Sequence, residues 1–452
     1  MTLKHRGLGV AALIAVGVAS GGLVGRHSAA VGLLALVVVG ILAIVATTQV
    51  LIGRLDEPEA VVVVRRWALA SLGVHLAVGL IVVNSGTLTN FLGPDALTYD
   101  SLATQIAGHW SHGTAMPSLP AGKEGYYYVL AVVYWVFGHS TWAGVALNAM
   151  LAALLVPIVS DTTWRLFGRS AARYATAIVV VVPGIVLWTS QLLKEASFVF
   201  LVAVAANCAV RLVHRYSAGP LVVLAMVIPV LLSFRSQLGF AIGVGIFAGI
   251  VLGRGEVAGG LVGGLLVAAL AAVVVGLGVG SSGYDTAVGS NLKQANAARQ
   301  GLAAADSGFA SQTDISSTPR AVIFLPLGLV TVAVGPFPWQ LHGTRQLVAV
   351  PDILAWWVLA AAFWWGQRAA RQRGRQWLVL FIPAVAVAAV LALIIGNFGT
   401  VVRERMQVLV LLAPIMALGL AERRARRDAA AAADDPGARP GAPAAVTGAA
   451  LR

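Results

Sequence analysis

Residues 30–52 read AVGLLALVVVGILAIVATTQVLI, with no charged side chain among them. A helix of about 20 apolar residues is long enough to cross the roughly 30 Å of hydrocarbon in a lipid bilayer. Similar runs recur from residue 8 to residue 420. They are continuously apolar, whereas the strands of a membrane barrel alternate in polarity. The sequence therefore predicts an all-α, polytopic transmembrane helical bundle.

The overall composition agrees with a chain that lies mostly in lipid. Of 452 residues, 59% are hydrophobic and 11% are charged, and the mean hydropathy is +0.86. A soluble globule could not keep so much apolar surface away from water. We expect about twelve spans, at residues 8–24, 30–52, 67–84, 141–160, 174–191, 196–213, 219–234, 237–252, 258–280, 352–366, 376–396 and 406–422.

The net charge of +13 is explained by membrane topology, and we expect no nucleic-acid partner. Short loops on the cytoplasmic side of membrane proteins are enriched in Lys and Arg. In the twelve-span layout the arginine-rich loops share that side, which predicts a plasma-membrane protein with both termini in the cytoplasm. They contain Arg54, Arg65, Arg66, Arg165, Arg169, Arg173, Arg211, Arg215, Arg254, Arg368, Arg371, Arg373, Arg375, Arg423, Arg424, Arg426 and Arg427.

This layout divides the chain into a membrane domain, residues 1–422, and a tail, residues 423–452. The tail is rich in Ala, Asp, Pro, Gly and Arg, so we expect it to be disordered in the cytoplasm. The large outer loops are residues 85–140 and 281–351, and juxtamembrane helices are expected on the outer face. The layout requires residues 126–137 to lie on that face without crossing the membrane. Residues 321–335 are expected to be re-entrant or interfacial, and residues 291–305 to form a helix over the outer face.

Isolated charges at the edges of the apolar runs fall mostly on the predicted outer face. Such charges are costly near hydrocarbon unless they are paired or face water, so their default interpretation is functional. Separate connections supply them, and the active site is therefore expected to face outward. The residues are Asp95, Asp100, Lys123, Glu124, Lys194, Glu195, Arg235, Arg403, Glu404 and Arg405.

Asp95 is predicted to begin an interfacial helix. Ala96, Tyr99, Leu102, Ala103, Ile106 and Ala107 follow it at helical spacing. A simple N-cap role for Asp95 is the alternative. Asp100 would point about 140° away from Asp95 on this helix, so at most one of the two is expected to act as a base.

The basic residues of the outer face suit a phosphate ligand. Arg235, Arg403 and Arg405 can each donate paired hydrogen bonds to phosphate, and Lys194 can supply a further positive charge. Positions 403 and 405 lie about 200° apart on a helix, so only one is expected to face a given ligand. The alternative for Lys194 and Glu195 is a solvated turn, and for Arg235 it is an anchor at a helix end.

Aromatic and amide side chains on the same face are candidates for a substrate cleft. Tyr126 belongs to an aromatic run that predicts an interfacial belt first and a lipid or sugar cleft second. Tyr99 and Asn397 are further candidates for this cleft. His109 and His112 lack a third ligand at recognisable spacing, so no metal site is predicted, although a divalent metal is compatible with the sequence.

Together these motifs resemble the GT-C type glycosyltransferases that use polyprenyl phosphate sugars, in the branch of protein O-mannosyltransferases and aminoarabinose transferases. The resemblance rests on Asp95 entering a juxtamembrane helix, the segment Pro183 to Glu195, and the later outer arginines. It implies an inverting enzyme with catalytic carboxylates at Asp95 or Asp100 and at Glu195. Lys194, Arg235 and Arg403 or Arg405 would hold the lipid phosphate. The chain departs from the family in having Pro94-Asp95 in place of an acidic pair, and no soluble domain after the last span.

The expected function is transfer of a sugar from a polyprenyl phosphate carrier to a glycan, lipid or protein acceptor of the cell envelope. Two alternatives use the same lipid chemistry. One is a polysaccharide polymerase or ligase that joins oligosaccharides carried on polyprenyl diphosphate. The other is a flippase or transporter for a lipid-linked sugar, which would place charges near the middle of the membrane.

Overall fold

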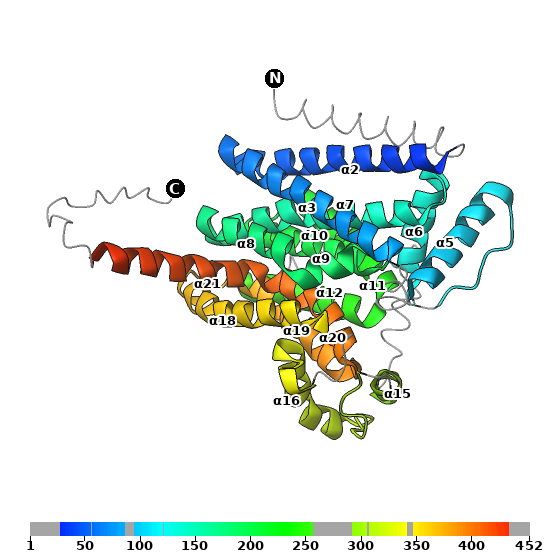
Figure 1. The fold of residues 1–452 in the computed structure, drawn as a ribbon. Coiled ribbons are helices and arrows are strands. Elements are labelled where there is room, and N and C mark those ends of the chain that lie inside the picture. Colours follow the sequence, from blue (N-terminus) through cyan, green and yellow to red (C-terminus); the bar gives the residue numbers. More distant parts are fainter. Residues whose placement is uncertain are drawn as a thin grey trace.

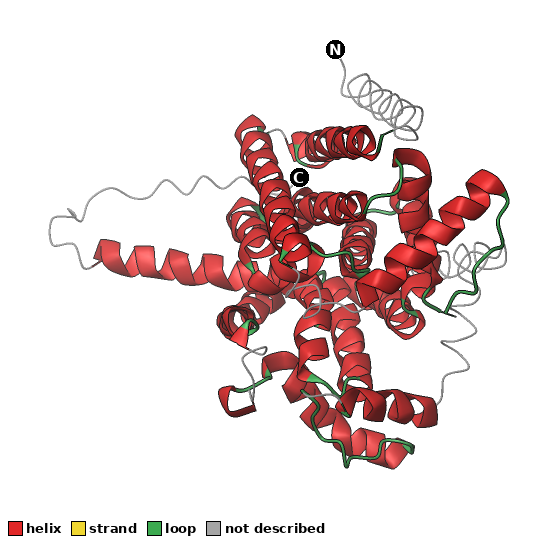
Figure 2. Cartoon of the chain, turned by 45° about the vertical axis from the view of Figure 1, so that its right-hand side comes forward, coloured by secondary structure: helices red, strands yellow, loops and turns green. Residues whose placement is uncertain are grey.

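The computed structural model describes residues 28–55, 57–85, 95–120, 122–255, 292–304, 307–340 and 347–433. Within these ranges the chain is helical, and its only β-type pairing is an isolated bridge between Gly308 and Asn397. Figures 1 and 2 show helices throughout the described residues, most of them packed into one bundle. The all-α prediction is confirmed.

Six helical segments in the described ranges are long and apolar enough to cross a membrane. These are Ala29–Leu55 (α2 and the short η1), α3 (Pro58–Asn84), α7 (Thr141–Phe167), α10 (Glu195–His214), α12 (Ser236–Arg254) and α21 (Met406–Ala433). They support a multi-pass protein in a lipid bilayer.

A broken seventh candidate consists of α8 (Arg169–Val181) and α9 (Pro183–Thr189), which are bent by 50° relative to each other. Three apolar helices are shorter, namely α11 (Ala218–Phe234), α16 (Thr318–Val334) and α19 (Leu378–Ile394). Helix α18 (Val350–Gln372) covers another predicted span. The count of twelve stays a prediction, because residues 8–24 and 258–280 lie outside the described ranges.

The core of the bundle is formed by α7, α10 and α21. In their apolar stretches 89%, 78% and 78% of the residues are buried, against 28% for α2 and 33% for α3. Large apolar side chains such as Leu34, Ile81 and Val358 are more than half exposed. An apolar surface of this kind suits hydrocarbon better than water. Helices α2 and α3 are thus peripheral, with one face left for lipid.

The break between α8 and α10 decides where the first candidate charges lie. Pro183 has no backbone N–H and a restricted φ, so it starts a new helix more readily than it continues one. Helix α9 ends at Thr189, and residues 190–194 are not helical. Helix α10 then begins at Glu195, which places Lys194 and Glu195 at its N-terminus.

Several of the predicted helices outside the spans are present. Helix α5 (Asp95–His112) buries Tyr99, Ala103, Ile106 and Ala107, as its apolar spacing predicted. It packs on α6 (Glu124–Phe137), which is not among the candidate spans. The predicted helix at residues 291–305 is observed as α15 (Leu292–Ala303).

One predicted boundary is wrong. We expected disorder from residue 423, but α21 continues as a helix to Ala433. Ala-rich sequence with few residues that break helices is a good helix former even without a core to cover. Residues 434–452 of the predicted tail lie outside the described ranges.

Candidate functional site

Six charged residues from four parts of the chain gather at one end of the bundle. Asp95 begins α5, and Lys194 and Glu195 stand at the start of α10. Arg235 is the single extended residue between α11 and α12. Arg403 and Glu404 belong to α20 (Phe398–Glu404). We call this set the charge cluster.

Glu195 lies at the centre of the charge cluster. Its Oε1 accepts a hydrogen bond from Arg235 at 2.9 Å and lies 3.2 Å from Nε of Arg403. Arg235 also forms an ion pair with Glu404. Arg403 lies 3.5 Å from Asp95 and 3.8 Å from Glu404. The structure thus brings together residues that are distant in sequence.

Access to the charge cluster differs between its three carboxylates. The side chains of Glu195 and Glu404 are 1% and 3% exposed, whereas that of Asp95 is 51% exposed. The Arg403 side chain between them is 19% exposed. Asp95 is therefore the most accessible carboxylate of the charge cluster. Glu195 and Glu404 contact the arginines from the buried side.

Lys194 contributes a buried cation to this set. Its residue is 6% exposed, and no described residue accepts a hydrogen bond from its ammonium group. Burial, together with the positive charge of Arg235, lowers the pKa of Lys194 to about 7. Near neutral pH this lysine is poised between its charged and uncharged forms.

Tyr99 lies beside the charge cluster on α5. Its ring packs at 5.0 Å against the ring of Tyr126 in an edge-on arrangement. Burial and the nearby charges of Glu195 and Asp95 raise the pKa of Tyr99 well above its ordinary value. The Tyr99 hydroxyl therefore stays protonated and can serve as a hydrogen-bond donor.

The non-helical segment before Lys194 is held by Asn148, a residue that the sequence analysis missed. From the N-terminal third of α7, Asn148 donates to the carbonyl oxygens of Gln191 at 2.5 Å and Leu193 at 2.8 Å. It also donates to the Tyr126 hydroxyl at 3.1 Å. Tyr126 is fully buried, so it supports the site from within and does not line an open cleft. An Asn inside an apolar run is the signal that could have revealed this role.

Arg405 does not join the charge cluster. Its side chain is 1% exposed and pairs with Asp352 of α18 at 2.6 Å. It also donates to the carbonyl oxygen of Gly335 at 2.7 Å and lies over the Trp356 ring. Asp352 in turn accepts from the backbone N–H of Gly184 in α9 at 2.8 Å. Arg405 is therefore committed to helix packing, and its assignment to phosphate binding is corrected.

Asp100 also lies apart from the charge cluster. It accepts a hydrogen bond from the Tyr134 hydroxyl at 2.5 Å and lies 3.4 Å from His139. Asp95 and Asp100 thus have different partners, as expected from their separation of about 140° on the helix. This arrangement favours Asp95 over Asp100 as the accessible acid of the site.

Asn397 has a structural role and not the predicted place in a substrate cleft. Its side chain accepts from the Thr400 N–H at 3.2 Å and thereby caps the N-terminus of α20. The same oxygen accepts from the Ser307 hydroxyl at 2.8 Å. Asn397 consequently fixes the start of the short helix that carries Arg403 and Glu404.

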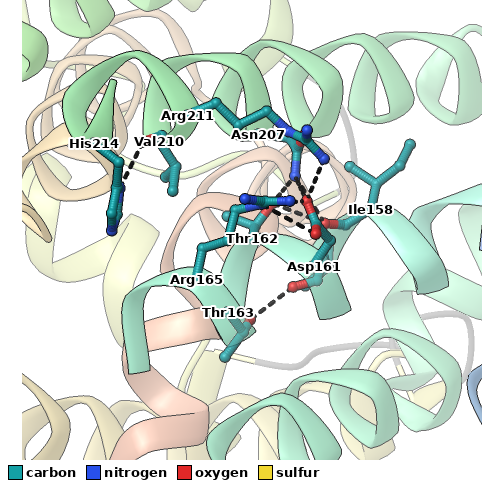
Figure 3. A network of polar contacts seen from close by, with 10 residues as sticks. Ile158, Asp161, Thr162, Thr163, Arg165, Asn207, Val210, Arg211 and His214 are labelled. Atoms are coloured by element: carbon teal, nitrogen blue, oxygen red, sulfur yellow. Dashed lines mark hydrogen bonds and ion pairs between the residues drawn. The ribbon is translucent and has the colours of Figure 1, made fainter. Parts of the chain in front are cut away.

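A second buried network, also missed by the sequence analysis, lies on the later parts of α7 and α10 (Figure 3). Asp161 is fully buried and accepts from Arg165 at 2.9 Å, Asn207 at 2.8 Å and Arg211 at 2.7 Å. The loop charges predicted only a role in membrane topology for both arginines. In the structure Arg211 joins α10 to α7 through Asp161, and Arg165 pairs with the same carboxylate within α7.

In the described ranges, no group of three or more His, Cys, Asp or Glu side chains lies at a spacing suited to a metal ion. His109 instead makes a hydrogen bond to the carbonyl oxygen of Thr114 through Nδ1. The charge cluster thus combines carboxylates with Lys and Arg side chains, a set suited to an anionic ligand.

Comparison with known proteins adds no assignment. No protein-family model matches the sequence, and no characterised protein matches it significantly.

Proposed function

We propose that this protein is an integral membrane glycosyltransferase that moves a sugar from a polyprenyl phosphate carrier to a cell-envelope acceptor. In this proposal the charge cluster faces the outer leaflet of the plasma membrane. The observation that carries the proposal is the contact of Arg403 with both Asp95 and Glu195. It combines an accessible carboxylate with cations suited to phosphate at one place.

The cations of the charge cluster are proposed to bind the phosphate of the carrier. Lys194, Arg235 and Arg403 carry three positive charges, and Asp95, Glu195 and Glu404 balance them with three negative charges when all are ionised. The contact of Arg403 with Asp95 is the most exposed one and, at 3.5 Å, among the longest. A phosphate would therefore replace Asp95 on Arg403 more easily than it would replace Glu195. Lys194 would supply the second contact.

Once phosphate has taken the place of Asp95 on Arg403, the Asp95 carboxylate would be free to act as a base. The acceptor hydroxyl oxygen forms a bond to the anomeric carbon, and the bond from that carbon to the phosphate oxygen breaks. The hydroxyl proton passes to Asp95, and the polyprenyl phosphate leaves with the bonding electron pair. The negative charge that grows on the phosphate is stabilised by Arg403 and Lys194. One displacement of this kind inverts the anomeric configuration.

Glu195 takes a positioning role in this mechanism. Its carboxylate is nearly inaccessible and is shared between Arg235 and Arg403. Such a charge fixes the direction of both guanidinium groups before the substrate arrives, which reduces the reorganisation needed during reaction. The earlier assignment of Glu195 as a catalytic carboxylate is therefore revised to orientation of the arginines.

The test is transfer of a radiolabelled sugar from a polyprenyl phosphate to membrane acceptors by the purified full chain in proteoliposomes. We expect transfer by the wild type and strong loss in Asp95→Asn and Arg403→Gln. Glu59→Gln serves as a matched control because the Glu59 side chain is 86% exposed and lies on α3. Full activity in both cluster variants would overturn the proposal.

The form of the product separates the alternatives. A ladder of repeating units made from a polyprenyl diphosphate oligosaccharide would identify a polymerase. Passage of unchanged labelled lipid across the membrane would identify a flippase.

A further inference from the structure

A basic pocket lies between α18 and α21, beyond the apolar parts of both helices. It has a volume of about 380 Å³ and is lined by Trp365, Arg368, Ala369, Gln372, Glu422, Arg423 and Arg426. Arg405 follows Glu404 of the charge cluster directly and pairs with Asp352, which joins the other ends of the same two helices. The basic pocket therefore belongs to the opposite end of the bundle and is separate from the proposed active site.

The charges in the basic pocket are unbalanced. Its one carboxylate, Glu422, is taken by Arg373, which donates to it at 2.7 Å. No described carboxylate pairs with Arg368, Arg423 or Arg426. All three of these side chains are exposed. Three guanidinium groups thus line the pocket without an ion-pair partner in the part of the chain that the structure describes.

Two of these three arginines lie over exposed tryptophan rings, which indicate the polarity of the surroundings. The Arg368 guanidinium lies over the Trp364 ring at 4.6 Å, and that of Arg423 lies over the Trp365 ring at 4.9 Å. The tryptophans are 53% and 38% exposed. Exposed Trp beside an apolar helix face is typical of the boundary between lipid tails and headgroups.

We propose that the basic pocket binds the phosphate headgroup of an anionic phospholipid such as phosphatidylglycerol. Arginine forks match phosphate geometry, and basic pockets between transmembrane helices are suited to anionic headgroups. The volume is in the range of small-molecule sites. The exposed tryptophans and the apolar face of α18 offer contacts to the acyl chains, which a soluble phosphate would leave unused. This inference does not depend on the proposed function.

The experiment is lipid binding to the full chain in detergent, followed by native mass spectrometry. Phosphatidylglycerol is titrated into the wild type, with phosphatidylcholine as the zwitterionic comparison. The site variant is Arg368→Gln/Arg423→Gln/Arg426→Gln. The matched control is Arg65→Gln/Arg66→Gln/Arg215→Gln, which removes the same charge elsewhere.

We expect the wild type to prefer phosphatidylglycerol, and the site variant to bind it at least about tenfold more weakly, because each arginine contributes to anionic lipid binding. The control variant should bind like the wild type. Equal weakening in both variants would show a diffuse charge effect and overturn the proposal.

A second variant tests the pocket without a change of charge. Ala369→Trp adds bulk to the pocket lining and should also weaken phosphatidylglycerol binding. Unchanged binding in this variant would contradict a headgroup inside the cavity. Inorganic phosphate is added to the wild type as a separate arm. If inorganic phosphate does not displace phosphatidylglycerol, the result supports a lipid headgroup as the ligand. Complete displacement would assign the pocket to soluble phosphate and overturn the proposal.

Discussion

Asp95 and Arg403 are separated by 308 positions in the sequence, yet their side chains lie 3.5 Å apart. Asp95 begins a helix outside the spans, and Arg403 lies in a short helix just before α21. Glu195, at the start of a third helix, contacts Arg403 from the buried side. Arg403 thus links the accessible carboxylate of Asp95 to the buried carboxylate of Glu195.

Replacing Asp95 should lower the rate of sugar transfer more than the affinity for the carrier. In Asp95→Asn the amide cannot accept the acceptor proton as a carboxylate does, and we expect transfer to fall by about 100-fold or more. Arg403 loses its competitor for phosphate, so the affinity for the carrier should be unchanged or higher. Single-turnover kinetics with separate binding measurements check both parts. A weaker affinity with an unchanged rate would contradict this role.

Replacing Glu195 should affect both arginines at once. Glu195→Gln leaves Arg235 and Arg403 without their shared carboxylate, so we expect a higher KM for the carrier together with a lower kcat. Glu195→Asp retains the charge and should recover part of the activity. If Glu195→Gln instead abolished kcat with KM unchanged, Glu195 would be the catalytic acid or base and the positioning role would be wrong.

Carrier binding should depend on pH through the protonation of Lys194. Its pKa is lowered to about 7, so the ammonium form that attracts phosphate dominates about one pH unit below that value and is lost as the pH rises through it. The KM for the carrier should therefore rise above pH 7, by at most about tenfold per pH unit, since bound phosphate favours the protonated form. Lys194→Arg keeps its charge and should remove this rise. A flat KM in the wild type from pH 6 to pH 9 would exclude the role.

Arg405 and Asp352 should behave as a structural pair. Both are nearly inaccessible and hydrogen-bonded to each other. Arg405→Gln and Asp352→Asn should each lower thermal stability, and the double variant should lose less than the sum, with a coupling of about 1–3 kcal/mol. The KM for the carrier should not change in any of them, provided the variants are measured below their unfolding temperatures. Additive losses would show that the pair is not coupled.

Asp161 should contribute to stability through α7 and α10. Asp161→Asn leaves Arg165 and Arg211 without a charge partner, and both are partly exposed, so we expect a loss of about 2–3 kcal/mol in the free energy of unfolding. Thermal unfolding in detergent measures it. The matched control is Asp428→Asn in the exposed pair with Arg424, which should leave the unfolding temperature unchanged. Equal effects of the two variants would contradict the importance of the buried network.

The sequence was most informative where a local pattern determines the outcome. Apolar spacing predicted the buried face of α5, because helical periodicity places Tyr99, Ala103 and Ile106 on one side. The charge pattern of the loops predicted Asp95, Arg235 and Arg403 on one face of the membrane, and in the structure they lie in one cluster around Arg403 and Glu195. Angular separation on a helix predicted that Arg403 and Arg405 would face different surroundings, and in the structure they pair with Glu195 and Asp352, respectively.

Other features depend on contacts that leave no local signal. Asp352 stands in the first turn of an apolar helix, and nothing nearby in sequence indicates that Arg405 is its partner. Asp161 follows a predicted span, and the arginines near it in the sequence were explained by membrane topology without it. Asn397 resembles a ligand residue in isolation, but its position at the start of α20 makes it a cap. Helix length is also hard to predict, because an Ala-rich continuation such as residues 423–433 does not need apolar burial.

The most direct test of the central claim is the preference of the charge cluster for phosphate. Binding of a short-chain polyprenyl phosphate and of the matching polyprenol is compared in the wild type and in Arg403→Gln. We predict that the wild type binds the phosphate at least about tenfold more tightly than the alcohol, and that Arg403→Gln loses most of this preference. Equal binding of both lipids by the wild type, or an undiminished preference in Arg403→Gln, would contradict the claim.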